Sequence, residues 1–441
     1  MVSLNTNTAE NMMSVFSRAK DLHKRIMFTI LALIVFRLGT FIPFPGINIS
    51  VLQDFFRDNN VGLLGMFNAF TGGALERMSI FALNIMPYIS ASIIVQLGAS
   101  VIPSLALLKK EGASGFQKLS QYTRYLTVLI AVMQAFFMAR ALQGAGAVIP
   151  GAHMFTLSTV VSLLGGTMFV VWLGEQITAR GVGNGTSLII MVGIIAGVPR
   201  AIAQVLTESK AGVISPIIVL FLLALVIGVV YVVVLFERAQ RRIVVHYPKQ
   251  QSMGRMMQST ASHLPLKINP TGVMPPIFAS ALLAIPVAIV QFSSKNSDSN
   301  IAQQLAVWLT PGQWVYMAIF ALLIFFFTFF YTGVQSNPKE TAENLKKQGG
   351  FIAGIRPGEA TAQYLDYVIT RLTLLAAVYL VVLCILPEFL IATFKVPFFL
   401  GGTTLLIVVS VIMETASQVQ SHLIAYQYEG LIKKAKLKGR F

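Results

Sequence analysis

Apolar residues along this chain fall into long runs, and the lengths of the runs predict which segments cross a membrane. A helix crosses the hydrocarbon layer with roughly 20 apolar residues. Runs of about this length, separated by polar segments, occur at 26–44, 78–97, 122–141, 154–177, 186–205, 215–236, 271–292, 314–334, 368–390 and 398–416. The pattern predicts an all-α polytopic membrane protein with ten transmembrane helices.

One further apolar stretch is too short to cross. Residues 61–70 are followed by a Thr-Gly-Gly break at 71–73 and then by the charged pair Glu76 and Arg77. Such a piece can only be re-entrant, interfacial or enclosed by other protein. An irregular backbone at membrane depth is tolerated where it is buried in protein or lines an aqueous cavity. We therefore expect this stretch to mark a pore or a binding site.

Composition and charge agree with a membrane protein and indicate its orientation. Of the 441 residues, 55% are hydrophobic and only 11% are charged, and the mean hydropathy is +0.73. The net charge is +16, and placing both termini and every second loop on one face puts 25 of the 33 Lys and Arg residues there. Because the cytosolic loops of membrane proteins carry the excess of Lys and Arg, both termini are expected to be cytosolic.

Five spans, a longer polar connection and five more spans suggest two halves. An odd number of spans in each half makes the halves inverted relative to each other. The sequence itself shows no convincing internal repeat. The expected segments are a cytosolic N-terminal part (1–25), a first five-helix half (26–205) with the re-entrant segment 61–75, the fifth-to-sixth connection with the sixth helix and a cytosolic loop (206–270), the remaining helices with the cytosolic loop 335–367 (271–416), and a basic cytosolic tail (417–441).

Familiar catalytic and metal-binding patterns are missing from the sequence. It contains no H-E-x-x-H, G-x-S-x-G or G-x-x-x-x-G-K-[ST] motif, and its five histidines lack metal-ligand spacing. The single cysteine, Cys384, lies in an apolar run and is best explained by packing. The glycine-rich segment 181–185 lacks the lysine of a phosphate loop and is interpreted as a tight turn that opens the next span. We expect no catalytic residue, no metal and no cofactor.

Three classes of function fit a multi-pass protein of this kind. They are a passive channel, an ion-coupled secondary transporter that uses the broken stretch as its substrate site, and an intramembrane enzyme. A coupled transporter is expected to keep carboxylates deep in the membrane, whereas Glu175 and Glu414 lie near the ends of spans. A paired nucleophile and base, which an enzyme would need, is not apparent. The pattern favours the channel.

Two loops on the expected cytosolic face are long enough to project from the membrane. The first carries Arg241 and Arg242, and the second carries Arg356 followed by Pro357 and Gly358. Basic residues there are often simple topology signals. They could also bind an anionic partner. For Arg356 the second interpretation is favoured, because a proline-glycine turn presents the preceding side chain at a tip.

Two features inside the spans have a structural and a functional interpretation. Ile85 and Ile89 are four residues apart and share one face of a helix. Such a pair usually faces lipid or packs, and only a cavity on that side would give it another role. Arg37, within the first span, is preferred as a packing residue over a cavity residue.

The sequence resembles the SecY family, the channel subunit of the bacterial Sec protein translocon. The residues that carry the resemblance are FR at 36–37, FIP at 41–43 with PG at 45–46, SIFAL at 79–83 with MPYISAS at 86–92, QYTRY at 121–125, WLGEQI at 172–177, ER at 237–238 with QRRIVV at 240–245, HLPLK at 263–267, GIRPGE at 354–359, and the segment 399–409. They extend over most of the chain and agree in order with the ten spans.

The resemblance implies an hourglass-shaped channel of two inverted five-helix halves that opens sideways to lipid. Residues 61–75 would be the plug, a short re-entrant helix, and its matching positions are Leu63, Leu64, Met66, Phe67, Phe70, Gly72 and Gly73. The constriction ring would consist of Ile85, Ile89, Thr186, Ile190, Ile277 and Ile407. The family usually has an aliphatic residue at position 186. The Thr186 hydroxyl could bond back to its own helix or could hydrate the ring. Asn84, where the family commonly has a small residue, has no assigned role.

The implied function is translocation of unfolded secretory polypeptides across the bacterial inner membrane, with release of membrane segments sideways into lipid. The energy would come from partners. Those implied are the SecE and SecG subunits, the SecA motor ATPase, the ribosome, signal-bearing polypeptides and membrane lipid. Arg241, Arg242 and Arg356 match the family's docking residues for SecA and the ribosome. The first loop is less basic than is usual in the family, which implies a weaker ribosome contact.

Overall fold

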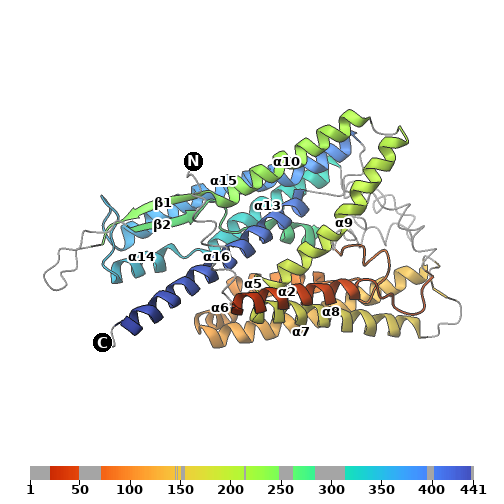
Figure 1. Cartoon of the computed structure of the whole chain (residues 1–441), viewed down its shortest axis with the longest axis horizontal. Coiled ribbons are helices and arrows are strands. Elements are labelled where there is room, and N and C mark those ends of the chain that lie inside the picture. Colours follow the sequence, from red (N-terminus) through yellow and green to blue (C-terminus); the bar gives the residue numbers. More distant parts are fainter. Residues whose placement is uncertain are drawn as a thin grey trace. The chain divides into compact units, whose positions relative to one another are not determined.

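The computed structural model describes residues 20–48, 71–144, 146, 148–149, 154–212, 215–247, 262–283, 313–394 and 402–438 (Figure 1). Within these ranges the chain is helical apart from connecting segments and one two-stranded sheet. Seven helices of the described part are long and apolar enough to cross a membrane. The model thus agrees with the predicted all-α polytopic class.

The chain divides into two compact units. The first extends to Gln204 and resumes at Ile407, and the second comprises Val205–Leu406. The helices of the first unit are α2 (Lys20–Gly39), α5 (Met86–Val101), α6 (Pro103–Lys110), α7 (Ala113–Gly144), α8 (Phe155–Arg180) and most of α9 (Gly185–Lys210). Within it α7 packs on both α5 and α8, and α2 packs on α8 (Figure 1).

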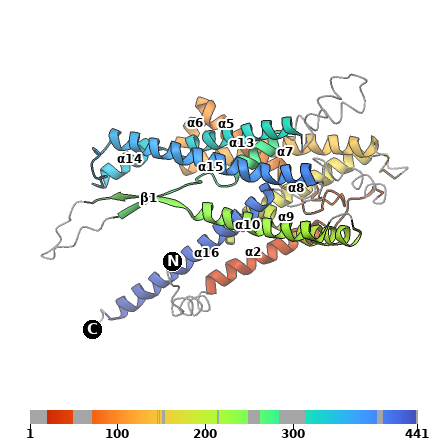
Figure 2. The ribbon, with the colours of Figure 1, turned by 90° about the horizontal axis from the view of Figure 1, so that it is seen from above.

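The second unit begins within α9 and ends within α16 (Gly402–Lys438). Its other elements are α10 (Pro216–Arg238), β1 (Gln240–Val245), β2 (Ser262–Lys267), a short Met274–Leu283 helix, α13 (Trp314–Gln335), α14 (Pro338–Lys347) and α15 (Glu359–Phe394). Both α13 and α14 pack on α15. Figure 2 shows β1 continuing from the end of α10, and β2 pairs with β1 antiparallel.

Local sequence signals explain where several of these helices begin. Ser215 caps α10, because its side-chain oxygen accepts a hydrogen bond from the Ile218 N–H at 3.4 Å, and Pro216 occupies the first helical position. Asn337 caps α14 in the same way, with Glu340 N–H as donor. The start of α10 lies one residue from that of the predicted span 215–236, whereas α14 lies within the predicted loop 335–367.

The predicted span 78–97 is wrong at its start. Residues 71–85 form turns, and α5 begins only at Met86. The reason is the backbone conformation of Met78 and Asn84, whose φ angles are +42° and +49°. These values lie in the left-handed region, which cannot continue a right-handed helix. The apolar run therefore includes a turn-rich segment and a helix of 16 residues.

The segment after α2 runs alongside the segment that precedes α5. The Phe44 N–H donates to the Met78 carbonyl at 3.1 Å, and the Ile80 N–H donates to the Ile42 carbonyl at 3.0 Å. Gly39 permits a close approach at this point, because a Cβ there would lie 1.9 Å from the Phe81 ring. The turn-rich segment is thus attached to the end of α2.

Candidate pore constriction and docking loops

The end of the expected plug can be followed from position 71 onward. The plug positions Leu63, Leu64, Met66, Phe67 and Phe70 lie outside the described residues. Gly72 and Gly73 are described, with φ angles of +66° and +81°. Both conformations favour glycine, which has no Cβ to oppose a positive φ. The Thr-Gly-Gly break is therefore a sharp change of chain direction, as the sequence suggested.

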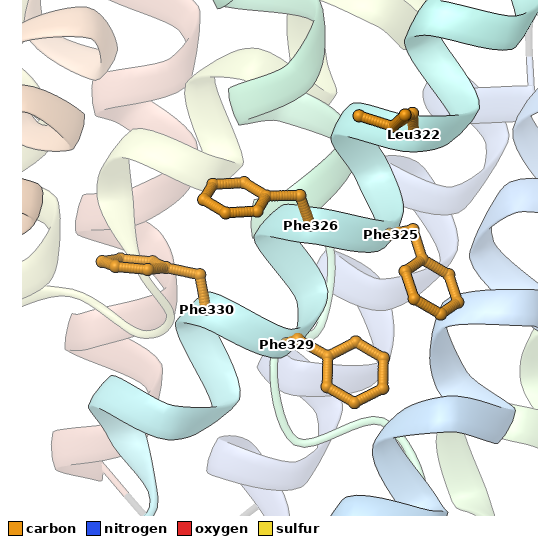
Figure 3. A pocket seen from close by; sticks show the side chains of 5 residues that line it. All are labelled: Leu322, Phe325, Phe326, Phe329 and Phe330. Atoms are coloured by element: carbon orange, nitrogen blue, oxygen red, sulfur yellow. The ribbon is translucent and has the colours of Figure 1, made fainter.

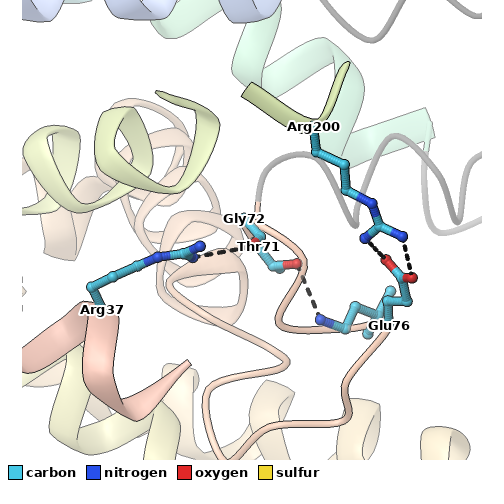
Figure 4. A network of polar contacts seen from close by, with 6 residues as sticks. Arg37, Thr71, Gly72, Glu76 and Arg200 are labelled. Atoms are coloured by element: carbon cyan, nitrogen blue, oxygen red, sulfur yellow. Dashed lines mark hydrogen bonds and ion pairs between the residues drawn. The ribbon is translucent and has the colours of Figure 1, made fainter. Parts of the chain in front are cut away.

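Gly72 is held between two helices of the first unit (Figure 4). Its carbonyl oxygen accepts a hydrogen bond from Nη1 of Arg37, on α2, at 3.0 Å. On its other side, a Cβ at position 72 would lie 2.7 Å from the Gly193 carbonyl oxygen, on α9. Only glycine fits this contact without a shift of the backbone. Arg37 thus joins α2 to the segment that begins at Thr71.

A bidentate ion pair fastens the same segment four residues further on (Figure 4). Nη1 and Nη2 of Arg200, on α9, donate to the two carboxylate oxygens of Glu76 at 2.6 and 2.8 Å. The Glu76 side chain is only 14% exposed, whereas that of Arg200 is 65% exposed. Exposed pairs stabilise by up to about 1 kcal/mol, and bidentate geometry places this pair among the stronger ones.

Two arginines share one aromatic ring beside this segment. The guanidinium carbons of Arg37 and Arg77 lie 4.7 and 4.3 Å from the centre of the Phe41 ring. Cation–π contacts of this kind stabilise by roughly 0.5–2 kcal/mol. They add to the attachment of the segment 71–77 to the end of α2.

Four of the six expected ring positions form two pairs, 85 with 89 and 186 with 190, each four residues apart, whereas Ile277 and Ile407 lie singly on two other helices. Ile85 precedes the first residue of α5, and the Ile89 N–H donates to its carbonyl at 3.0 Å. Thr186 and Ile190 lie in the first turns of α9, and the side chains of Ile85 and Ile190 are 1% and 9% exposed. Ile407 lies on α16, also in the first unit, and Ile277 lies on the Met274–Leu283 helix of the second unit.

Thr186 has both branches of its side chain engaged. Its hydroxyl donates to the side-chain oxygen of Asn184 at 2.7 Å, and the same oxygen accepts the Thr186 N–H at 3.2 Å. Its methyl group lies 3.4 Å from where a Cβ on Gly174 would be. The hydroxyl thus donates to the side chain of the residue before the helix, and not to the backbone of its own helix, which was one of the two options open from the sequence.

Asn84, which had no assigned role, has a conformational explanation. Its φ of +49° is in the left-handed region, and the residue is only 3% exposed. Asparagine adopts this region more readily than other residues with a side chain. Asn84 lies in the turn that precedes α5, which begins two residues later.

The glycine-rich segment 181–185 is a turn, as predicted. Its backbone donors are used within the protein: the Val182 N–H donates to the Thr29 hydroxyl at 3.0 Å, and the Gly183 N–H donates to the Gln418 side chain at 2.9 Å. A phosphate loop needs such N–H groups for its ligand. The segment instead connects α2, α8, α9 and α16.

The two basic loops predicted from the sequence share one folded core. The strands β1 and β2 pair antiparallel, with Arg241 opposite Leu266 and Arg242 opposite Pro265. We call the cluster beneath them the hairpin core; its buried residues are Ile243, Val245, Ala342, Leu345, Ile352, Ala362, Leu365, Val368 and Leu372. The backbones of His246 and Phe351 exchange two hydrogen bonds, of 2.8 and 2.9 Å. The hairpin, α14 and the start of α15 thus form one body.

The basic residues of these loops are displayed on the surface of this body. Arg241, Arg242 and Arg356 are all exposed. Gly354 and Gly358 flank Arg356 with φ angles of +82° and +111°, and the Thr361 hydroxyl donates to the Arg356 carbonyl at 2.8 Å. The turn geometry expected from the proline-glycine pair is therefore present. The hairpin itself was not predicted, although alternating burial along β1 fits the sequence QRRIVV.

An apolar hollow lies along α13 (Figure 3). Its lining consists of Leu322, Phe325, Phe326, Phe329 and Phe330, all from this helix. Figure 3 shows Phe326 and Phe330 on one side of the helix and Phe325 and Phe329 on the other. Sites for small polar substrates combine apolar walls with placed polar groups, and this lining has none. In the described ranges no group of three His, Cys, Asp or Glu residues could hold a metal ion.

Comparison with known families and proteins gives consistent matches over almost the full length. The family model SecY matches residues 79–416. The chain is 49% identical to the protein translocase subunit SecY of Vibrio cholerae, over 97% of each chain. It is 50% identical to the protein translocase subunit SecY of Escherichia coli K12, over 95% of this chain and 96% of that protein.

Solved structures match the fold at low sequence identity. A protein-conducting channel superposes with a TM-score of 0.65 at 18% identity, covering 92% of this chain and 93% of that one. A SecY structure described in terms of its plug domain and the closed state gives 0.64 at 19% identity over the same shares. Sec61 in a canine ribosome-channel complex gives 0.62 at 17% identity, again over 92% and 93%.

Proposed function

The chain belongs to the SecY family, and on this premise we propose how it moves polypeptides across a membrane. It is a multi-pass membrane protein and the channel subunit of a protein translocase. The observation that carries this conclusion is the identity of 49–50% to translocase subunits over at least 95% of the chain. The channel conducts unfolded secretory polypeptides and releases membrane segments into lipid.

The architecture that we propose has ten transmembrane helices in two inverted five-helix halves. Seven candidate spans occur in the described residues, together with the shorter apolar helices Met86–Val101 and Met274–Leu283. The proposed tenth is α2, which resembles the family's first span but contains the charged Arg37. The proposed segments remain 1–25, 26–205, 206–270, 271–416 and 417–441.

Residues 61–75 are proposed to be the plug of the channel. The sequence supports this because 61–70 is too short to cross a membrane. The contacts of Gly72 with Arg37 and Gly193, and of Glu76 with Arg200, hold the segment that follows it. A plug needs such a fixed point, because it must return to the same place after each substrate has passed.

The constriction ring is proposed to consist of Ile85, Ile89, Thr186, Ile190, Ile277 and Ile407. Branched apolar side chains contact a sliding chain without specific hydrogen bonds, so any sequence can pass. A narrow apolar ring also opposes water and ions by dewetting. The Thr186 hydroxyl donates its proton to Asn184, which supports a position for its methyl group towards the rest of the ring.

Transport is proposed to be driven by partners, because the chain itself is proposed to have no catalytic activity. Arg241, Arg242 and Arg356 are exposed on one folded body and would dock the SecA motor ATPase and the ribosome. One solved relative, Sec61, is described in a complex with a ribosome. SecE and SecG are the proposed companion subunits, and the proposed location is the bacterial inner membrane with both termini cytosolic.

Photo-crosslinking of a stalled, signal-bearing polypeptide tests the proposed path. Probes replace Ile89 and Ile277, and a control probe replaces Ile217, which is 79% exposed on the apolar helix α10. We expect the polypeptide to be labelled from 89 and 277 but not from 217. Labelling from neither ring position would overturn the channel path. The alternative of an ion-coupled transporter is not favoured, since the relatives are translocase subunits.

A further inference from the structure

The connection between β2 and the Met274–Leu283 helix is held by a buried polar network around Asn269. This side chain is only 3% exposed. Its Nδ2 donates to Oε1 of Glu237 at 3.0 Å and to the Gly272 carbonyl at 3.1 Å, while its Oδ1 accepts the Thr271 hydroxyl at 3.0 Å. One asparagine thus joins the end of α10 to the start of another helix.

The α10 end of this network is a firm anchor. The ring of Phe236, next to Glu237, stacks on Tyr379 of α15 with 4.2 Å between ring centres and planes 5° apart. One residue after α10, the Ala239 carbonyl accepts the Ile268 N–H at 3.1 Å. The β1–β2 hairpin therefore emerges from a point that is fixed to α15.

The other end of the network leads towards Ile277. Thr271 and Gly272, both bonded to Asn269, form the turn that begins the Met274–Leu283 helix. The Met274 N–H donates to the Thr271 carbonyl, and the Ile277 N–H donates to the Val273 carbonyl, each at 3.4 Å. A continuous series of hydrogen bonds therefore runs from the base of the hairpin to Ile277.

We propose that Asn269 is a positioning residue that couples the hairpin carrying Arg241 and Arg242 to the helix carrying Ile277. The inference rests on the proposed function, in which this hairpin receives the motor ATPase and Ile277 belongs to the ring. Docking on the hairpin then shifts the Ile277 helix because Asn269 makes both move together. Without Asn269 the motor ATPase still binds to the hairpin, but its binding no longer shifts the Ile277 helix.

Asparagine is suited to this position because the network needs donors and an acceptor on one side chain. Alanine would leave the Thr271 hydroxyl and the Gly272 carbonyl without this partner in a buried place. Aspartate would keep the hydrogen bond from Thr271, but its second carboxylate oxygen would be repelled by the Glu237 carboxylate and the Gly272 carbonyl oxygen. Changing Glu237 to glutamine as well would restore a donor opposite the aspartate.

The test compares Asn269→Ala, Asn269→Asp and the double variant Asn269→Asp/Glu237→Gln in proteoliposomes with purified SecA and a secretory precursor. Asn344→Ala is the matched control, since Asn344 is an exposed asparagine on α14 of the same body. SecA affinity and precursor translocation are measured separately. We expect unchanged affinity with translocation reduced about tenfold or more in both single variants, as for loss of a bond to a charged group. The double variant should regain part of the rate, and the control should equal the unmodified chain.

Separate outcomes would overturn the inference. Translocation at the unmodified rate by Asn269→Ala would show that no coupling passes through this residue, and a parallel loss of SecA affinity would reduce its role to folding of the hairpin. If Asn269→Ala does not fold, the comparison of Asn269→Asp with Asn269→Asp/Glu237→Gln takes its place. A higher translocation rate in the double variant supports the coupling, and an equally low rate in both excludes it. If the unmodified chain itself does not translocate, the proposed function fails, independently of Asn269.

Discussion

At the residue scale, the backbone conformation of Asn84 helps to determine where helix α5 begins. Its φ of +49° ends the turn before α5, and the side chain is buried. From the sequence, Asn84 lies within an apolar run that predicts a continuous helix. The residue types along that run do not predict a left-handed backbone conformation at Met78, because methionine rarely adopts this conformation. The start of α5 could not be predicted for this reason.

At position 84, a glycine variant should therefore be more stable than an alanine variant, which is the reverse of the usual order of stability. Both remove the side-chain amide, but only alanine opposes a positive φ. We expect Asn84→Gly to be more stable than Asn84→Ala by about 1 kcal/mol. Thermal unfolding in detergent measures the difference. Equal or inverted stabilities would show that the turn does not keep its conformation.

Ile85 gives a prediction about the seal. It is 1% exposed and lies directly before the first residue of α5. A charge at an apolar constriction favours wetting, so Ile85→Asp should raise ion leak several-fold in reconstituted channels. Ile85→Val, which stays apolar, should not. Unchanged leak with aspartate would argue against Ile85 as a ring residue.

At the scale of elements, the attachment of the proposed plug involves two adjacent glycines that differ in their surroundings. Both have positive φ, but a Cβ at Gly72 would lie 2.7 Å from the Gly193 carbonyl, whereas a Cβ at Gly73 would meet nothing within 4 Å. The first glycine is required by a close approach and by its φ, and the second by its φ alone.

This contrast predicts different effects of alanine at the two positions. Each substitution costs about 1 kcal/mol of backbone strain. Only Gly72→Ala also displaces the segment from α9, so it should raise resting ion leak clearly above that of Gly73→Ala. Planar bilayer conductance without a substrate measures both. Similar leak from the two variants would remove the link between the Gly72–Gly193 contact and the closed channel.

The body formed by the hairpin, α14 and the start of α15 gives a second prediction at this scale. Arg356→Glu changes an exposed tip residue outside the hairpin core, so the body should stay folded while SecA-driven translocation is abolished. Lys339→Glu, an exposed charge reversal on α14, is the control and should translocate normally. Limited proteolysis verifies folding in each. Normal export by Arg356→Glu would remove this residue from the docking surface.

The elements differ in how well the sequence predicts them. Transmembrane helices such as α8, α10 and α13 follow from the lengths of apolar runs, since crossing a bilayer requires that length. The Glu76–Arg200 pair and the Asn269 network are contacts between residues far apart in sequence, and no spacing rule predicts them. For Asn269, the turn signal in Asn-Pro-Thr-Gly at 269–272 indicates a break between elements but not its partner Glu237.

At the scale of the whole molecule, orientation in the membrane remains a prediction from the Lys and Arg distribution. The single cysteine makes it simple to test, because Cys384 is only 2% exposed and can be replaced. In a Cys384→Ala background, cysteines at the exposed positions Lys118 and Arg140 would lie on opposite faces. We expect an impermeant thiol reagent outside intact cells to label position 140 and spare 118. The reverse pattern would invert the proposed topology.

The composition of the hairpin core has a consequence for the order of events during synthesis. Its strand residues Ile243 and Val245 are made more than a hundred residues before Leu372 of α15. At about 5–20 residues per second, the nascent strand waits roughly ten seconds for its covering helices. During that interval its apolar side chains are exposed to aggregation and to proteases. The slow stage in folding of the nascent chain therefore falls on the hairpin that carries Arg241 and Arg242, two of the proposed docking residues.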